Sequence, residues 1–402
     1  MVLKILLNGI KIIMLKLVIK FFYLLSSQQR RNFYLLQFLT LIMAFVEILG
    51  LASVFPFLSL VGDMNQLQQD TIIAQIYQYS GISSELQFLF YLGLGVLFML
   101  IISAAVSMYT VWNLSMYATK VGAEIADRLY TYYLNKSWLF HTSGSTSELT
   151  KKIAVESQRA TSGILLPLMK LNSRITIVFF LGLAMFIYDP IVAIIGFIVF
   201  SISYYILYIL VRMRLQRNGK AISKVLGQRF RLMNEAFGGI KEILLMSRDD
   251  DFIDRFNKKG NKLAYSYGAN SALKQLPRYF MELIAFSSMI MLVLYLIANH
   301  GSNLGVILPI LTVYALASLK LLPAFQQIYT SFATIKGNIA AFESMEQDLK
   351  ESSTKKVIKK NKSEKFLHLT NKIILDNITF SYPNKEPTLK EITLSIEAKS
   401  VI

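Results

Sequence analysis

Six long apolar stretches divide this chain, and they constrain its fold more than any other feature. Each is long enough, or nearly so, to cross a hydrocarbon core of about 30 Å, which needs about 20 residues of helix. The third could start as early as Ile164. We therefore predict an all-α membrane protein with six long transmembrane helices, at roughly 33–60, 86–111, 171–187, 191–211, 281–298 and 304–322.

The charge distribution predicts the orientation of these helices. Charged residues make up only 17% of the sequence, against about 25% in a soluble domain. The net charge of +17 could suggest a nucleic-acid partner. However, segments 61–85, 188–190 and 299–303 contain no Lys or Arg, whereas 112–163 contains six and 212–278 contains fifteen. Because Lys and Arg accumulate in cytoplasmic segments, we expect a bacterial-type inner-membrane protein with cytoplasmic termini and no nucleic-acid partner.

The two basic inner segments are predicted to be helical. Apolar residues recur at three- and four-residue spacing in 123–134 and 232–245, which is typical of amphipathic helices. The second to fifth membrane helices should therefore have long cytosolic extensions, and a short crossing helix should join each pair at its tip.

The N-terminal stretch 1–32 is apolar but has lysines throughout. A signal peptide would place its charge before an uninterrupted apolar core. We therefore expect an interfacial elbow helix in contact with membrane lipids, with a short seventh span as the alternative.

The composition changes again near the C-terminus. The six-helix region is expected to end at about residue 345, and seven lysines between 350 and 365 indicate a flexible linker, assigned to 346–370. Alternating strand-like residues begin at Ile373, so 371–402 reads as a separate β-rich domain.

Residues 373–383 and 388–396 of this domain resemble the opening β-strands of an ATP-binding cassette. With six preceding spans, the chain resembles a type 1 ABC exporter. The resemblance implies that Tyr382 stacks on adenine, that ATP and Mg²⁺ serve the complete protein, and that two copies form a homodimer. The phosphate-loop pattern G-x-x-x-x-G-K-[ST] is absent from this sequence, so we expect a truncated cassette that does not itself hydrolyse ATP, although the full-length parent would.

We expect neither a catalytic constellation nor a metal site, because the chain has no cysteine and three dispersed histidines.

Two segments resemble the coupling regions through which the exporter family contacts its cassettes. The first contains Trp138, Leu139 and Phe140. The second helix is expected near 245–252, with Leu245, Met246 and Ser247 as its candidate contacts. The alternative is that both are ordinary solvated helices.

Ionisable residues in or near the spans are the candidate substrate residues, because charges there are costly and usually face a cavity or a partner. Glu47 lies in the middle of the first span, and Arg278 and Glu282 can meet on one face of the fifth helix. Lys320 lies at the end of the sixth span. For Lys320, Lys170 and Arg174, snorkelling to the interface is the competing explanation.

Short motifs around Glu47, Arg278 and Lys320, with an outer segment at 65–81, resemble the PglK-like exporters. That branch flips lipid-linked oligosaccharides and meets the lipid pyrophosphate with basic residues, which implies such a role for Arg278 and Lys320. Ser103 stands where the branch can carry another arginine, so the exact substrate is left open. The alternatives are a peptide, bacteriocin or multidrug exporter and, from another class, a non-transporting membrane receptor or channel.

Overall fold

The computed structural model divides the chain into two compact units, Met1–Lys356 and Val357–Ile402. Each unit is described by itself. The residues that the structure describes are 20–62, 64, 67, 72–82, 84–143, 145–188, 190–300, 304–354, 370–382 and 386–400.

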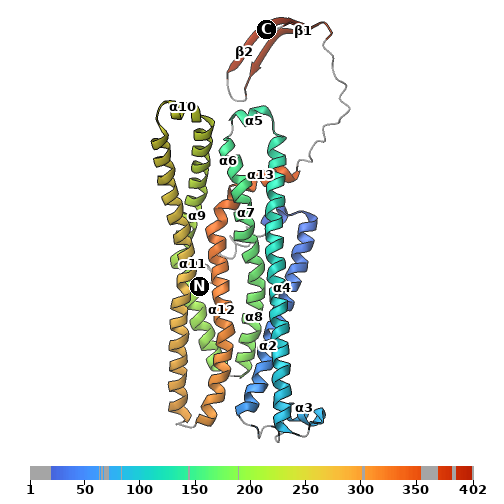
Figure 1. The fold of residues 1–402 in the computed structure, drawn as a ribbon, viewed down its shortest axis with the longest axis vertical. Helices are drawn as coiled ribbons and strands as arrows, with labels where there is room; N and C mark the ends of the chain where they lie inside the picture. Colours follow the sequence, from blue (N-terminus) through green and yellow to red (C-terminus); the bar gives the residue numbers. More distant parts are fainter. Residues whose placement is uncertain are drawn as a thin grey trace, which may run out of the picture. The chain divides into compact units, whose positions relative to one another are not determined.

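The first unit is a bundle of long helices (Figure 1). Its six longest are α2 (Ser27–Gly62), α4 (Glu85–Leu134), α8 (Leu166–Tyr188), α9 (Pro190–Gly238), α11 (Asp249–His300) and α12 (Leu304–Glu343). The shorter helices among the described residues include α3 (Ile72–Ser80), α5 (Trp138–Ser143), α6 (Thr146–Lys151), α10 (Ile240–Leu245) and α13 (Glu346–Thr354). The third span continues without a break from α6 through the π-helical turn η2 (Lys152–Glu156), α7 (Ser157–Ala160) and the π-helical turn η3 (Thr161–Leu165) into α8.

Four stretches of described helix are long and apolar enough to cross a membrane. They are Ser27–Gly62, Glu85–Leu134, Thr146–Ile187 and Ala193–Gly238, and they contain the first four predicted spans. Helices α11 and α12 cover the predicted fifth and sixth spans, where many side chains lie outside the described set. The prediction of long helices that extend well beyond the apolar windows is confirmed.

Local sequence explains where several of these helices begin. Pro190 opens α9, where its fixed φ and missing N–H suit a first helical position. Three acidic residues, Asp249 to Asp251, occupy the first turn of α11 and complement the positive end of the helix dipole.

The short helices mark the two ends of the first unit. In Figure 1, α5 and α10 lie at one end, here called the tip end, and α3 lies at the other, the α3 end. The long helices run between these ends.

The largest hydrophobic core lies toward the tip end and unites distant parts of the chain. It includes Phe21 and Leu25 from the N-terminal segment, Leu129 of α4, Phe342 at the end of α12, and Met345 between α12 and α13. Because Leu349 of α13 is also fully buried there, α13 is packed into the first unit. Residues 346–354, which the sequence analysis assigned to a flexible linker, are therefore helical and anchored.

At the α3 end, α3 packs on the α2–α4 pair. Ile73 and Tyr77 contact a cluster formed by Leu60, Leu67 and Phe88, and the Tyr77 and Phe88 ring centroids are 5.0 Å apart. The apolar side chains of α3 thus partly face the protein, whereas Ile76 is 54% exposed. Residues 65, 66 and 68–71 of the expected outer segment lie outside the described residues.

The second unit contains an antiparallel hairpin of β1 (Lys372–Ser381) and β2 (Pro387–Glu397). Ile374 pairs with Ser395, and the register shifts between Leu375 and Ile378. Asn377 on one strand and Glu391 on the other have positive φ angles of 48° and 50°. The predicted strands from Ile373 onward are confirmed.

Candidate substrate-facing and coupling sites

Glu47 joins three helices within the apolar part of the first unit. Its side chain on α2 is 8% exposed. The carboxylate accepts hydrogen bonds from Ser107 Oγ of α4 (3.1 Å) and from Arg174 Nη1 of α8 (3.0 Å). Arg174, for which snorkelling was the competing explanation, is therefore paired with Glu47. The carboxylate's hydrogen bonds to neighbouring helices explain its burial, and a substrate role for Glu47 stays a prediction.

Ser103 of α4 lies at a close contact with Gly50 of α2. It is 8% exposed, and a Cβ atom added to Gly50 of α2 would lie 3.2 Å from Ser103 Cβ. A long basic side chain could not occupy this position without separating the two helices. The small residue at 103 is thus a packing requirement of this helix pair.

Arg278 and Glu282 meet on one face of α11, as their four-residue spacing predicted. Arg278 Nε donates to Glu282 Oε1 at 2.6 Å. The Arg278 side chain is 57% exposed and that of Glu282 is 31% exposed. An ion pair as open as this is weak because solvent screens it, so the guanidinium can exchange its partner easily.

Lys320 is half-buried on α12, which packs against α11, the helix of Arg278. Met281 of α11 and Leu322 of α12 pack in one apolar cluster around Tyr204 and Tyr329. Arg278 is three residues from Met281, and Lys320 is two residues from Leu322. The two cations therefore flank the same apolar layer on neighbouring helices.

The first tip presents an aromatic and aliphatic surface. Trp138, the first residue of α5, is 80% exposed, and Leu139 is 37% exposed. Phe140 turns inward, where its ring stacks on Tyr133 with centroids 6.1 Å apart. Of the three predicted coupling residues, Trp138 and Leu139 thus face outward, whereas Phe140 attaches α5 to the end of α4.

The second tip differs from its prediction. The short helix α10 covers Ile240–Leu245, whereas the sequence analysis expected it near 245–252. The helical conformation is interrupted at Gly239 and again at Ser247, whose φ is 51°. The next helix, α11, begins at Asp249. Leu245 and Met246 are 75% and 71% exposed, and Ser247 is also exposed. The predicted residues lie at the tip, but Met246 and Ser247 belong to the turn that follows α10.

In the second unit, Tyr382 follows β1 directly and is 41% exposed. Its ring packs edge-on against Phe380 with centroids 5.1 Å apart, which fixes the ring and leaves much of it open. Such a ring is suited to stack on a planar base. Among the described residues no cluster of three or more His, Asp or Glu could hold a metal ion.

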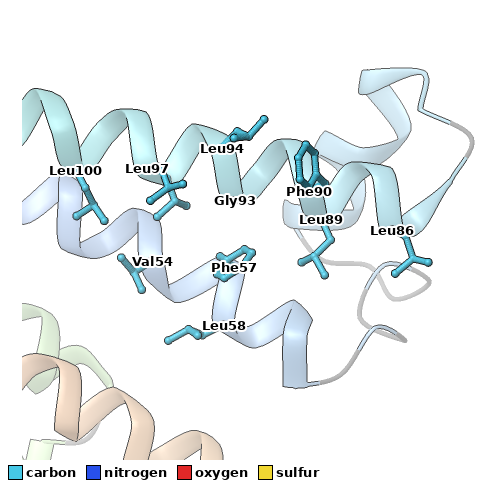
Figure 2. Close-up of a pocket in the computed structure, with 11 residues that line it drawn as sticks. Val54, Phe57, Leu58, Leu86, Leu89, Phe90, Gly93, Leu94, Leu97 and Leu100 are labelled. Carbon is cyan, nitrogen blue, oxygen red and sulfur yellow. The ribbon is translucent and has the colours of Figure 1, made fainter.

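An apolar cavity of about 580 Å³ lies between α2 and α4 toward the α3 end (Figure 2). Val54, Phe57 and Leu58 of α2 face Leu89, Gly93 and Leu97 of α4 across it. A Cβ on Gly93 would lie 3.1 Å from the Phe57 ring, so Gly93 makes room for this aromatic side chain. The cavity could not be predicted from the sequence, because the residues on both of its sides have the composition of ordinary apolar spans.

Comparison with known families settles the class. Residues 53–321 match the model of the ABC transporter transmembrane region. The chain belongs to this family. That assignment removes the alternative of a non-transporting receptor or channel, and it implies ATP use in the complete ABC transporter.

Individual relatives support the fold and the class. The ABC transporter chain is similar to an ATP-dependent lipid A-core flippase of Pseudoalteromonas translucida (strain TAC 125), with 23% identity over 291 residues. The match covers 71% of this chain and 48% of the flippase, so the chain spans about half the length of that relative. It is also similar in fold to a bacterial Atm1-family ABC exporter solved with ATP bound. The TM-score is 0.62 at 11% identity, over 92% of this chain and 61% of that one.

Proposed function

We propose that this chain is the membrane subunit of an ATP-driven exporter that flips a lipid-linked oligosaccharide or a related amphiphile with an anionic headgroup. The observation that carries the proposal is the pair of cations, Arg278 and Lys320, that flank one apolar cluster on the neighbouring helices α11 and α12. Charged side chains beside apolar spans are costly and usually serve a ligand or partner. The similarity to a lipid A-core flippase supports an amphiphilic substrate.

The arrangement of Arg278 suits reversible binding. Its partner Glu282 is on the same helix, and the pair is largely exposed. A phosphate or pyrophosphate group offers the guanidinium a charge-assisted, bidentate partner. Lys320 would add a second positive charge from the neighbouring helix. In this proposal Glu282 competes with the substrate and keeps the site from binding too tightly for release.

The tip end would contact the ATP-binding cassettes from the cytoplasmic side. Trp138 and Leu139 of α5, with Leu245 and Met246 after α10, expose apolar surface there, and such surface commonly marks a protein-binding site. In the complete transporter, ATP with Mg²⁺ would drive the cycle, and Tyr382 would stack on the adenine. A homodimer would supply the second set of helices needed to enclose a pathway.

Binding of a pyrophosphate-linked polyprenyl lipid to the chain in nanodiscs tests the proposal. We expect the lipid to bind more tightly than the corresponding neutral alcohol, and Arg278→Gln with Lys320→Gln to reduce this preference. Arg231→Gln is a matched control, because Arg231 forms the same kind of exposed i,i+4 pair with Glu235 but lies nearer the tip end. Equal binding of the two lipids by the parent chain would contradict the proposal and favour a peptide or multidrug substrate.

A further inference from the structure

Helix α13, which leads out of the first unit toward the second, is held by both apolar and polar contacts. Met345, just before it, and Leu349 within it are fully buried with Phe342 in the tip-end core. The polar face of α13 has three acidic residues, Glu346, Asp348 and Glu351. Each of them binds different partners, so they attach α13 to different parts of the first unit.

Asp348 and Glu351 bind the end of α4 and the start of the third span. One Asp348 oxygen accepts from Tyr133 Oη at 2.7 Å and from Lys152 Nζ at 2.6 Å. Glu351 accepts from Lys136 Nζ at 3.0 Å and from the Tyr132 hydroxyl. These contacts of Asp348 and Glu351 are here called the acidic clasp. They are charge-assisted hydrogen bonds, which are the stronger class.

Tyr132 and Tyr133 at the end of α4, and Lys136 just after it, also hold α5. The Tyr133 ring, 3% exposed, stacks on Phe140 with an interplanar angle of 14°. His141 Nε2 donates to the Tyr133 carbonyl oxygen at 3.0 Å. Lys136 Nζ lies 4.4 Å from the Tyr132 ring centroid and 5.4 Å from that of Phe140. Tyr133 and Lys136 therefore contact α13 on one side and α5 on the other.

The third acidic residue is attached elsewhere. Glu346 pairs with Lys20 of the N-terminal segment (3.0 Å) and with Lys350 of α13 itself (2.8 Å). Neither partner belongs to α4 or α5. Glu346 is therefore a matched control within α13. Its removal weakens the attachment of α13 but leaves the residues that hold α5 unchanged.

From these contacts we infer that Tyr132, Tyr133 and Lys136 are positioning residues that tie α13 to the first tip helix α5. Displacement of α13 releases the Tyr133 hydroxyl and the Lys136 ammonium, and the rings that hold Phe140 then lose their fixed orientation. Since Trp138 is 80% exposed, α5 depends strongly on these inward contacts. A movement of the segment that leads to the second unit would reach the first coupling surface through the end of α4 alone.

This inference gains its functional meaning from the proposed coupling role of α5, but its test measures no transport. The chain has no cysteine, so a spin label on Thr142→Cys reports on α5 alone, and one on Ser353→Cys reports on α13. Both positions are exposed. The labelled chain is studied in nanodiscs by electron paramagnetic resonance, with Asp348→Asn and Glu351→Gln combined to open the acidic clasp and Glu346→Gln as the control.

We expect the clasp variant to shift both labels toward the mobile spectral component. The control should leave the Thr142 label as in the parent chain. Tyr133→Phe, which removes the hydroxyl but keeps the ring on Phe140, should shift the Thr142 label in the same direction by a smaller amount. An unchanged Thr142 spectrum in the clasp variant would overturn the inference, as would an equal shift in Glu346→Gln. Either result would leave the proposed flippase function untouched, because that function is tested by lipid binding.

Discussion

Glu47 on α2 and Arg174 on α8 form an ion pair with a 3.0 Å contact inside the apolar part of the bundle. The two residues are 127 positions apart in the sequence. Glu47 also accepts from Ser107, so one carboxylate fixes the mutual positions of three membrane helices. Such a pair is expected to favour one arrangement of the helices more than to add stability.

Breaking this pair from one side should destabilise the bundle. Glu47→Gln leaves the Arg174 guanidinium without its counter-charge, which should cost about 2 kcal/mol. Glu47→Gln combined with Arg174→Gln removes both charges and should recover part of the loss. Thermal unfolding of the parent chain and the two variants in one detergent measures this. A double variant less stable than Glu47→Gln would show that Arg174 stabilises the chain by another contact.

Gly219 of α9 should tolerate no side chain. A Cβ there would collide with the carbonyl oxygen of Gly337 on α12, and a backbone atom cannot move aside as a flexible side chain can. We expect Gly219→Ala to cost about 1–3 kcal/mol. Gly182→Ala on α8 is the control, because a Cβ there meets nothing within 4 Å and alanine favours the helix. Similar melting temperatures for the two variants would contradict the close α9–α12 approach.

Removing the competing carboxylate should strengthen anion binding at Arg278. Glu282→Gln abolishes the exposed i,i+4 pair, which belongs to the weak, solvent-screened class of ion pairs. The affinity for a pyrophosphate-linked lipid should rise about twofold. Titration of the nanodisc-bound chain measures it, with Glu235→Gln as the equivalent change in the pair nearer the tip end. Weaker binding after Glu282→Gln would mean that Glu282 positions Arg278 for the ligand.

Acid should open the acidic clasp. The hydrogen bond from Tyr132 is the largest of the effects that lower the pKa of Glu351 from 4.5 to about 2. A carboxyl group with a lowered folded-state pKa contributes stability above its unfolded pKa, and that contribution is lost as the pH falls through the folded value. The Ser353 label should therefore become more mobile between about pH 4.5 and pH 2. In Glu351→Gln the Glu351-dependent part of this change should be absent.

The two ends of the bundle should face opposite sides of the membrane. Gln78 of α3 is exposed at the α3 end, and Thr142 of α5 is exposed at the tip end. A membrane-impermeant maleimide should label Gln78→Cys in intact cells and Thr142→Cys only after lysis, because Lys and Arg gather near the tips. The opposite labelling pattern would invert the proposed orientation.

Hydropathy and charge were enough to predict the helical spans, the long extensions and the strands from Ile373 onward, since these depend on local composition. The Glu47–Arg174 contact could not be predicted, because helical periodicity does not determine how distant helices are rotated against one another. Helix α13 could have been found: Phe342, Met345 and Leu349 have helical spacing, but the lysines that follow suggested a solvated linker. At the second tip, the apolar residues up to Met246 suggested that the helix before the turn continues that far. It ends at Gly238 instead, where two consecutive glycines, Gly238 and Gly239, interrupt it.

The two π-helical turns in the third span, Lys152–Glu156 and Thr161–Leu165, have a consequence for insertions and deletions. Each residue of an α-helix turns the chain by about 100°, and a π-helical turn accommodates one residue beyond the regular repeat. Because the wider turn takes up the extra residue, deleting one residue from either turn should restore a regular helix and leave the downstream side chains, Arg174 included, facing as they do. A deletion in the regular helix between these turns and Arg174 would instead rotate everything downstream by about 100° and turn Arg174 away from Glu47. The two turns are thus the positions in the third span where loss of one residue should do the least harm.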